Sequence, residues 1–522
     1  MATPPTDADT GSAWPRRLAC GLALLLYLGL TIGYGQGLRG TDQYWYVADI
    51  QTLTLGGPAT TNTVFPATIT SGTALPPPFI HHGVAMYLAL PFALLLGAHP
   101  GLVAFNVLCG GLAALLAALA ARRLSAAPGA GSLTFVLFLL LPLTTWLSSQ
   151  PLMDPFLGLL VAIMAFLASR AGQKPWSWLL LALVAGFAAQ HRVNLLPVAL
   201  GLPLMYLGVN RPVRLPKAGV ALLMLLLALA LVKLKGLLFA HGVRAPLASL
   251  LNISLNPREM VTDNGLYGYM HVYFDIRHLP VEWMKVAGKA ASNLGVQLWP
   301  GGFSAGLMMW LFNLLLLPAL LLAGWRRQAQ ARPLWWLLLL LLAAHLVTIC
   351  LFQNQFRYQI HVMAALVPAA VAALAVARPG ILRSRKAVTV LLTVVILVLG
   401  AVNAAGVAEK RHEAARHVQA RQAMAEVASH LPGDASLAVE YPAVPQFLLV
   451  GYALRPRLCL YLPKGYTRQE YGLLLSRARA THLLARQGSP LTGQLPAAAT
   501  EVARDFPPPY QDCVLYRLTL AP

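Results

Sequence analysis

The sequence predicts a polytopic α-helical membrane protein with about 11 transmembrane helices and a small C-terminal extracytoplasmic α/β domain. Three observations lead to this fold class. Of the 522 residues, 57% are hydrophobic and 11% are charged, with a mean hydropathy of +0.63, which excludes a soluble, disordered or disulfide-rich chain. The apolar residues gather in long runs. After about residue 408, polar residues and short β-rich segments replace them.

Twelve apolar runs approach the roughly 20 residues that a helix needs to cross about 30 Å of hydrocarbon. In chain order they are residues 18–37, 79–98, 101–121, 132–147, 155–169, 176–189, 195–207, 218–240, 304–324, 334–352, 359–377 and 387–407. The first run follows Arg16 and Arg17 and has no small-residue cleavage site, so we expect a retained helix and not a cleaved signal peptide.

Basic residues in the connections between the runs predict the orientation. Lys and Arg number 39 against 18 Asp and Glu, a formal charge of +21, but the cations lie in short loops and form no nucleic-acid-binding motif. Connections of this kind stay in the cytoplasm. The residues concerned are Arg16, Arg17, Arg122, Arg123, Arg170, Lys174, Arg211, Arg214, Lys217, Arg326, Arg327, Arg332, Arg378, Arg383, Arg385 and Lys386.

This orientation predicts a cytoplasmic N-terminus, a transmembrane domain with two long external loops, and an external C-terminal domain. Their bounds are residues 1–17, 18–407 with the loops 38–78 and 241–303, and 408–522. Two full crossings between residues 79 and 121 would place Arg122 outside. One of those two runs is therefore expected to be interfacial, re-entrant or part of a bent element, which leaves eleven spans.

Acidic residues are sparse and lie on one side. Between residues 10 and 408 there are seven, and on this topology all of them are external: Asp42, Asp49, Asp154, Glu259, Asp263, Asp275 and Glu282. Carboxylates near a membrane are costly to desolvate, so a sparse and one-sided set marks candidates for a functional site. The alternative for each is an ordinary loop residue.

The segment after residue 407 predicts the small α/β domain. Helices are expected at 409–430 and 468–480, and strands at 436–440, 458–462, 482–486 and 513–520. Cys459 and Cys513 fall in two of these strands. In an oxidising compartment they pair if their strands are neighbours, and two isolated thiols are the alternative.

The first external loop begins with an aromatic and acidic segment, Gly-Thr-Asp-Gln-Tyr-Trp-Tyr-Val-Ala-Asp at residues 40–49. Its aromatic residues suit the headgroup layer and predict an interfacial helix, with Thr41 or Asp42 as the N-cap. Asp42 then lies at the boundary between water and lipid. The alternative is that Asp42 only caps the helix.

Three later segments on the external side carry further polar residues. They read Leu-Pro-Pro-Pro-Phe-Ile-His-His-Gly at 75–83, Gln-Pro-Leu-Met-Asp-Pro-Phe at 150–156 and Gln-Asn-Gln-Phe-Arg-Tyr at 353–358. An acidic residue after the first span, a Pro-Pro before the second, an Asp-Pro opening a later span and an Arg-Tyr before a late span resemble the GT-C superfamily of membrane glycosyltransferases. The likeness is greatest to the protein O-mannosyltransferase and lipid A aminoarabinose transferase branch. It covers roughly residues 15–410.

The resemblance implies transfer of a sugar from a polyprenyl-phosphate donor to an acceptor hydroxyl on a lipid, a glycan or a protein, with inversion. Asp42 is then the general base. Asp154 positions the acceptor, orients a cation or holds a divalent metal ion together with Asp42, although nothing in the sequence requires the metal. The residues expected to bind the donor phosphate are Arg357, Tyr358, Arg192 and His191. Those expected to line the substrate site are Asp49, His81, His82, Tyr267 and His271.

Two other classes of protein stay open at this stage. An O-antigen polymerase or ligase also joins lipid-linked sugars but commonly relies on basic residues in external loops. A lipid-linked sugar flippase or transporter predicts charge at the bilayer midplane and internal repeats, and neither is evident. The Ala, Leu and Arg bias suggests a GC-rich bacterial genome, hence an inner membrane with the active face in the periplasm and no nucleic-acid partner.

Overall fold

The computed structural model describes most of the chain in two compact units, which are treated separately. The described residues are 14–35, 41–55, 63–64, 83–125, 127–171, 174–192, 195–238, 287–288, 291, 294–295, 332–351, 356–441, 443–444, 450, 454, 459–463, 467–495 and 497–520. The first unit comprises Met1–Gly35, Val103–Ile253 and Phe274–Ala408. The second comprises Gln36–Leu102, Ser254–Tyr273 and Glu409–Pro522.

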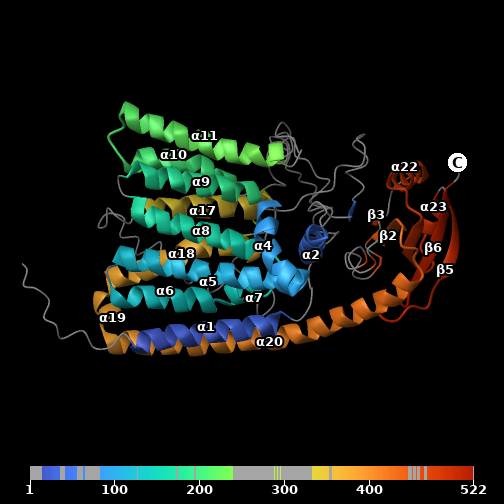
Figure 1. Ribbon diagram of the computed structural model, residues 1–522, viewed down its shortest axis with the longest axis horizontal. Coiled ribbons are helices and arrows are strands. Elements are labelled where there is room, and N and C mark those ends of the chain that lie inside the picture. Colours follow the sequence, from blue (N-terminus) through green and yellow to red (C-terminus); the bar gives the residue numbers. More distant parts are fainter. Residues whose placement is uncertain are drawn as a thin grey trace, which may run out of the picture. The chain divides into compact units, whose positions relative to one another are not determined.

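The first unit is a bundle of apolar helices (Figure 1). Its elements are α1 (Trp14–Tyr34), most of α5 (Ala98–Ser125), α6 (Pro128–Leu140), α7 (Pro142–Ser148), α8 (Asp154–Ala171), α9 (Pro175–His191), α10 (Leu196–Val209), α11 (Leu215–Leu238), α17 (Arg332–Leu351), η5 (Phe356–Tyr358), α18 (Gln359–Ala377), α19 (Pro379–Arg383) and the first part of α20 (Arg385–Ser429). Each predicted apolar run that lies on described residues coincides with a helix. The run at 304–324 lies outside the described residues.

Fewer spans are identified than the sequence predicts. In the described part of the chain, five helices (α1, α5, α8, α18 and α20) are long and apolar enough to cross a membrane, and the pair α6 and α7, bent by 56°, makes a sixth. Other apolar helices are shorter. For example, α10 has 14 residues and measures only about 21 Å at ~1.5 Å per residue, against about 30 Å of hydrocarbon. The predicted count of 11 is not confirmed.

The region with the topological inconsistency contains one long and one short helix. α4 (Gly83–Leu96) has 14 residues, whereas α5 has 28 and qualifies as a span. Among the described residues of this region, only α5 has the length of a full crossing, and Arg122 and Arg123 stand in its last turn. Residues 79–82 of the other run lie outside the described part, so the expectation that one of the two runs does not cross stays a prediction.

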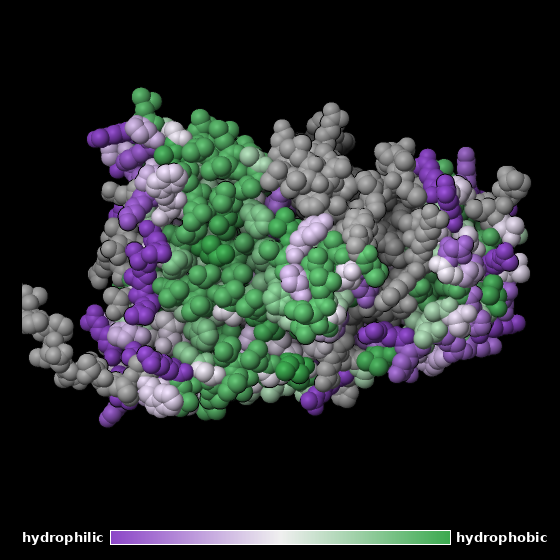
Figure 2. Space-filling model, viewed as in Figure 1, coloured by the Kyte–Doolittle hydropathy of each residue, from purple (hydrophilic) through white to green (hydrophobic). Residues whose placement is uncertain are grey.

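The centre of the bundle is α18, in which nearly every side chain is buried. It packs against α6, α8 and α17, and its alanine-rich sequence lets these neighbours approach closely. Outward-facing leucines on the outer helices form the broad hydrophobic surface of Figure 2. Hydrophilic residues gather at the end of the bundle where α19 lies. The order of buried core, apolar belt and basic end suits a protein surrounded by lipid.

The break between α6 and α7 is caused by Pro142, which has no N–H to continue the helical hydrogen bonds. Carbonyls near the bend accept hydrogen bonds from side-chain donors instead. The hydroxyl of Thr145 donates to the carbonyl of Leu139 at 3.3 Å, and Nδ2 of Asn403 on α20 donates to that of Leu140 at 2.8 Å. The bend therefore has a defined direction, and α7 leads into the turn before α8.

The second unit contains α2 (Thr41–Thr54), α4, the polar part of α20 and a six-stranded sheet with the order β1-β3-β2-β4-β6-β5. The strands are β1 (Thr63–Val64), β2 (Leu437–Tyr441), β3 (Cys459–Pro463), β4 (His482–Arg486), β5 (Ala497–Ala503) and β6 (Cys513–Leu520). β1, β3, β2 and β4 are parallel, and β6 is antiparallel to both β4 and β5. Helix α22 (Arg468–Ala478) buries Tyr471, Leu474 and Leu475 in the core of this sheet. The short helix α23 (Leu491–Gln494) follows β4.

The four predicted strands and the helix between them are all present, but β1, β5, the short helix α23 and the continuity of α20 were not predicted. β5 was not expected, and neither was β1, which comes from the first loop and pairs with β3. The span at 387–407 and the polar helix at 409–430 form a single 45-residue helix, α20, because no proline separates them.

The two cysteines of the sheet do not pair. β3 and β6 are separated by β2 and β4, so at about 4.8 Å per strand Cys459 and Cys513 are about 14 Å or more apart. A disulfide requires Cα atoms within about 7 Å. Both thiols are free and buried, and burial raises the pKa of each to about 12. Of the two alternatives, the isolated thiols are correct.

Candidate active site

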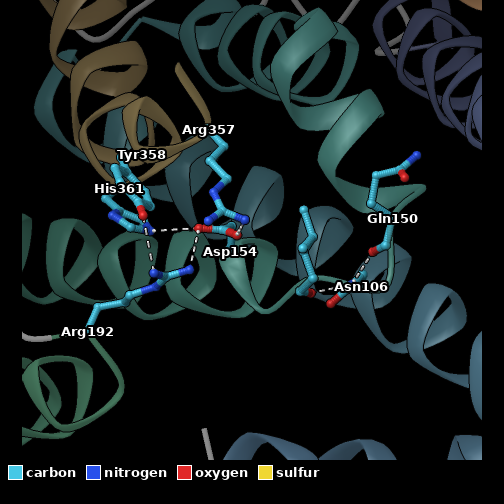
Figure 3. Close-up of polar contacts among 8 residues, drawn as sticks. Asn106, Gln150, Asp154, Arg192, Arg357, Tyr358 and His361 are labelled. Carbon is cyan, nitrogen blue, oxygen red and sulfur yellow. Dashed lines mark hydrogen bonds and ion pairs between the residues drawn. The ribbon is translucent and has the colours of Figure 1, made fainter. Parts of the chain in front are cut away.

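Three chain segments meet at the end of the bundle opposite α19. Asp154 is the first residue of α8, Arg192 directly follows α9, and Arg357 and Tyr358 form η5 immediately before α18. Because α8 and α9 are joined at their other end by a short connection, the start of the first and the end of the second lie together. Figure 3 shows the side chains pointing toward one another. The sequence named all four residues as site candidates, and the structure brings them together.

Asp154 lies between two guanidinium groups. Nη2 of Arg192 is 3.5 Å from its Oδ1, and Nη1 of Arg357 is 4.0 Å from its Oδ2. The carboxylate is fully buried, whereas the arginine side chains are 18% and 14% exposed. Both distances exceed that of a direct hydrogen bond. The pairs are therefore held by charge, and each guanidinium carries five N–H donors in a fixed fork.

Tyr358 and His361 complete this group. Nη1 of Arg192 donates to the Tyr358 hydroxyl at 3.4 Å, and the guanidinium groups of Arg192 and Arg357 stand 5.1 and 5.3 Å from the centre of the tyrosine ring. His361 stacks on the same ring with centroids 6.2 Å apart, and its Nε2 lies 3.8 Å from Oδ1 of Asp154. The sequence analysis missed His361, although it follows Tyr358 by three residues, a spacing that places two side chains on one helix face.

The cluster of Asp154, Arg192, Arg357, Tyr358 and His361 carries excess positive charge. Among the described residues of the first unit, Asp154 is the sole carboxylate. Two arginines, which stay protonated in proteins, face this one negative charge. A neutral His361 leaves a net charge of +1, which favours an anion.

The turn before Asp154 is fixed by a second residue that the sequence analysis missed. Asn106, on α5, is fully buried, and its Nδ2 donates to the carbonyls of Gln150 at 2.7 Å and Leu152 at 2.6 Å (Figure 3). A single polar residue in an apolar run was the available signal.

His191, predicted to help bind the phosphate, has an aromatic environment. Its ring packs edge-on against Phe156 and Phe187, with centroid distances of 5.4 and 4.9 Å. The side chain is buried at the end of α9, next to Arg192. It lies beside the cluster of charged residues.

The remaining predicted site residues belong to the second unit. α2 begins at Thr41 as expected, which places Asp42 in its first turn, but the Asp42 side chain lies outside the described part. Asp49 is fully buried on the same helix, in the second unit. The other candidates lie outside the described residues: His81, His82, Tyr267 and His271.

The described residues do not fit a divalent metal ion at Asp154. Both of its carboxylate oxygens face positively charged or imidazole nitrogens, with which a cation would have to compete. Within the described ranges, no group of three or more His, Cys, Asp or Glu side chains is placed to hold a metal.

The bundle with a charged cluster at one end has the fold of a known membrane protein. Two solved structures of ArnT from Cupriavidus metallidurans are similar to the chain. The one bound to undecaprenyl phosphate has a TM-score of 0.57 and 15% identity, covering 99% of this chain and 100% of that one. The apo structure has a TM-score of 0.56 and 13% identity, covering 97% and 98%. No protein-family model and no curated protein matches the sequence. The resemblance predicted from the motifs is thus confirmed for the fold.

Proposed function

We propose that the chain is a glycosyltransferase that moves a sugar from a polyprenyl-phosphate carrier to an acceptor hydroxyl on a lipid, a glycan or a protein. The observation that carries the proposal is the buried Asp154 between Arg192 and Arg357, at one end of a bundle with the ArnT fold. Polyprenyl phosphate is an anionic lipid whose phosphate lies at headgroup depth. A positively charged cluster at the end of an apolar bundle suits that phosphate.

The arginines stabilise the leaving group in this scheme. As the glycosidic bond to the carrier breaks, negative charge grows on the phosphate, which needs charge stabilisation more than a proton. Arg192 and Arg357 supply N–H groups in a fixed fork geometry, and Tyr358 adds a hydroxyl. Asp154 holds the two guanidiniums apart and aligned, which makes it a positioning residue.

Asp42 is the general base of the proposal. The acceptor oxygen attacks the anomeric carbon from the side opposite the phosphate, its proton passes to the Asp42 carboxylate, and the carbon inverts. Support comes from the helix start at Thr41 and from the place of Asp42 just after the first span. The products are the glycosylated acceptor and polyprenyl phosphate.

The proposed reaction takes place at the periplasmic face of a bacterial inner membrane. In the first unit, basic residues stand where α5, α8, α10 and α18 end and where α9, α11 and α20 begin, which is the end opposite the cluster. At this end of the bundle, Nε of Arg123 on α5 donates a hydrogen bond to the carbonyl of Ser169 on α8. Basic connections face the cytoplasm, so the cluster faces outward. A lipid carrier supplies sugar on that side, where nucleotide sugars are absent.

The test compares purified wild type with Asp42→Asn in detergent, measuring release of polyprenyl phosphate from a panel of polyprenyl-phosphate sugars in the presence of lipid, glycan and protein acceptor hydroxyls, with and without a chelator. We expect release by wild type and its loss in the variant at equal thermal stability. Release by the variant at the wild-type rate would contradict Asp42 as base. It would favour the O-antigen polymerase or ligase alternative, which relies on cations such as Arg192 and Arg357.

A further inference from the structure

We propose that Asn106 is a positioning residue for the charged cluster, acting through the turn that presents Asp154; its catalytic consequence rests on the proposed function. The amide nitrogen of Asn106 donates to two carbonyls, those of Gln150 and Leu152, which precede Asp154 by four and two residues. The two distances, 2.7 and 2.6 Å, are short for hydrogen bonds of this type. Asn106 itself contacts no member of the cluster in Figure 3.

The turn depends on this side chain because it is short of backbone donors. Pro151 and Pro155 have no N–H, so two of the groups that would normally serve nearby carbonyls are missing. The turn is fully buried, and a buried carbonyl without a donor is costly. One backbone bond, from the Leu152 N–H to the Gln150 carbonyl at 2.8 Å, closes the turn internally and gives the Gln150 carbonyl a donor besides Asn106, whereas the Leu152 carbonyl accepts from Asn106. The two hydrogen bonds from Asn106 link the turn to α5.

The position of the turn sets the position of the Asp154 carboxylate. α8 starts at Asp154, and its first hydrogen bond runs from the Leu157 N–H to the Met153 carbonyl at 3.2 Å, so the turn at residues 149–152 lies between the helical hydrogen bonds of α7 and those of α8. Asp154 must also keep both guanidiniums in range, at 3.5 and 4.0 Å. The longer distance is already at the limit for an ion pair. A shift of the turn by about 1 Å would break that pair and let Arg357 turn away, and displacements of that size can reduce rates by about 100-fold.

Asparagine suits this position because one nitrogen carries two N–H donors. Asn106→Asp would turn two donors into acceptors that face two carbonyl oxygens. Asn106→Leu has a similar size and offers no donor. Both variants remove the two hydrogen bonds from Asn106 to the turn, and the variants differ in charge. An effect common to both therefore comes from the lost hydrogen bonds.

Asn403 provides the matched control for a role in stability alone. It is also fully buried, and its Nδ2 also donates to two carbonyls, those of Leu140 at 2.8 Å and Leu399 at 2.7 Å. These carbonyls lie at the α6 bend and within α20, away from the turn of Asp154. Asn403→Leu therefore removes the same number of buried hydrogen bonds without releasing that turn.

The experiment is a pair of double-mutant cycles on the full-length protein in detergent. Each variant, Asn106→Leu and Asn403→Leu, is made alone and combined with Asp154→Asn. Two quantities are measured: the melting temperature, and the affinity for polyprenyl phosphate added as the probe. Coupling between neighbouring residues appears as non-additivity in such cycles.

We expect Asn106→Leu to weaken polyprenyl phosphate binding about tenfold or more, and to add nothing further once Asp154 is already Asn. Asn403→Leu should lower the melting temperature about as much as Asn106→Leu does and leave the affinity for polyprenyl phosphate unchanged. Its effect on the melting temperature should add to that of Asp154→Asn. Asn106→Asp should behave like Asn106→Leu.

Additive effects of Asn106→Leu and Asp154→Asn on both quantities would overturn the inference, as would equal losses of affinity in the Asn106 and Asn403 variants. A wild type that binds no polyprenyl phosphate would contradict the proposed function. In that case the melting-temperature cycle still decides whether Asn106 and Asp154 are coupled.

Discussion

Asp154 combines two properties that rarely occur together: it is fully buried, and it is shared by two arginines. Burial of a carboxylate is costly unless cations compensate it. Among the described residues of the first unit, two guanidiniums face this one carboxylate, which leaves an excess of positive charge. We interpret this excess of positive charge as a binding site for a second anion. Asp154 then sets the spacing of the arginines in the absence of that anion.

Asp154→Asn keeps the shape of the side chain and removes its charge. The two partly buried guanidiniums would then lose the carboxylate that lies between them. We expect stability to fall by roughly 3–5 kcal/mol, the usual range when one partner of a buried pair is removed, and the release of polyprenyl phosphate to fall with it. Thermal unfolding and the release assay measure the two effects. Wild-type values for both would show that Asp154 does not organise the arginines.

Arg357→Lys and Arg192→Lys test whether geometry matters beyond charge. Lysine keeps the positive charge but has a single point-like ammonium that cannot bind two phosphate oxygens in a fork. We expect each change to weaken binding of polyprenyl phosphate by about tenfold, or roughly 1.4 kcal/mol. The matched control is Arg170→Lys at the opposite end of α8, where the guanidinium lies 5.1 Å from the ring of Phe166. Equal affinity in all three variants would contradict a phosphate role for the cluster.

At the scale of elements, the C-terminal sheet holds a buried carboxylate with a structural role. Glu440 on β2 is fully buried and accepts hydrogen bonds from the backbone N–H of Arg486 at 2.9 Å and the hydroxyl of Ser489 at 2.6 Å. It fixes the end of β4 and the turn after it. The side chain joins neighbouring strands at the middle of the sheet.

Glu440→Leu leaves those two donors without an acceptor. We expect a loss of about 2–5 kcal/mol in stability, because each buried unsatisfied group costs about 1–3 kcal/mol. The control is Glu501→Ala, which removes a largely exposed ion pair with Arg504 and should change stability by less than about 1 kcal/mol. Thermal unfolding followed by circular dichroism measures both. Similar shifts in the two variants would contradict the role of Glu440.

The thiols of Cys459 and Cys513 give the sheet a predictable response to pH. Burial raises the pKa of each to about 12 from the ordinary 9.0, so the folded state holds these protons more tightly than the unfolded state. Their contribution to stability is complete below about pH 9 and is lost as the pH rises toward 12. At pH 8 we expect alkylation slower by roughly a thousandfold than for an exposed thiol, since the thiolate is the species that reacts. Rapid labelling of both, measured by mass spectrometry, would contradict their burial.

At the scale of the whole chain, features set by local sequence were predictable and features set by distant contacts were not. Apolar runs and strand patterns depend on neighbouring residues, which is why the helix positions and β4 and β6 agree with prediction. The pairing of β1 with β3 joins residues about 400 positions apart, and no local pattern encodes it. Asp154, Arg192 and Arg357 were identified as candidates because they lie in the predicted external turns, and Asp154 and Arg357 also match the motifs of the resembled superfamily. The ion pairs that these residues share depend on how α5, α8, α9 and α18 pack together. The contacts of His361 and Asn106 depend on the same packing, so neither could be predicted from local sequence.

The orientation of the chain is open to a direct measurement. The proposal places the α10–α11 connection, with Arg211, Arg214 and Lys217, in the cytoplasm, and the C-terminus in the periplasm. We expect alkaline phosphatase, which is active only outside the cytoplasm, to be active when fused after residue 522 and inactive after Arg211. Green fluorescent protein fusions should give the reverse pattern, which controls for expression. The opposite result at both positions would place the arginine cluster on the cytoplasmic side. Nucleotide sugars are available there, and the need for a lipid-linked donor, on which the proposed function depends, would disappear.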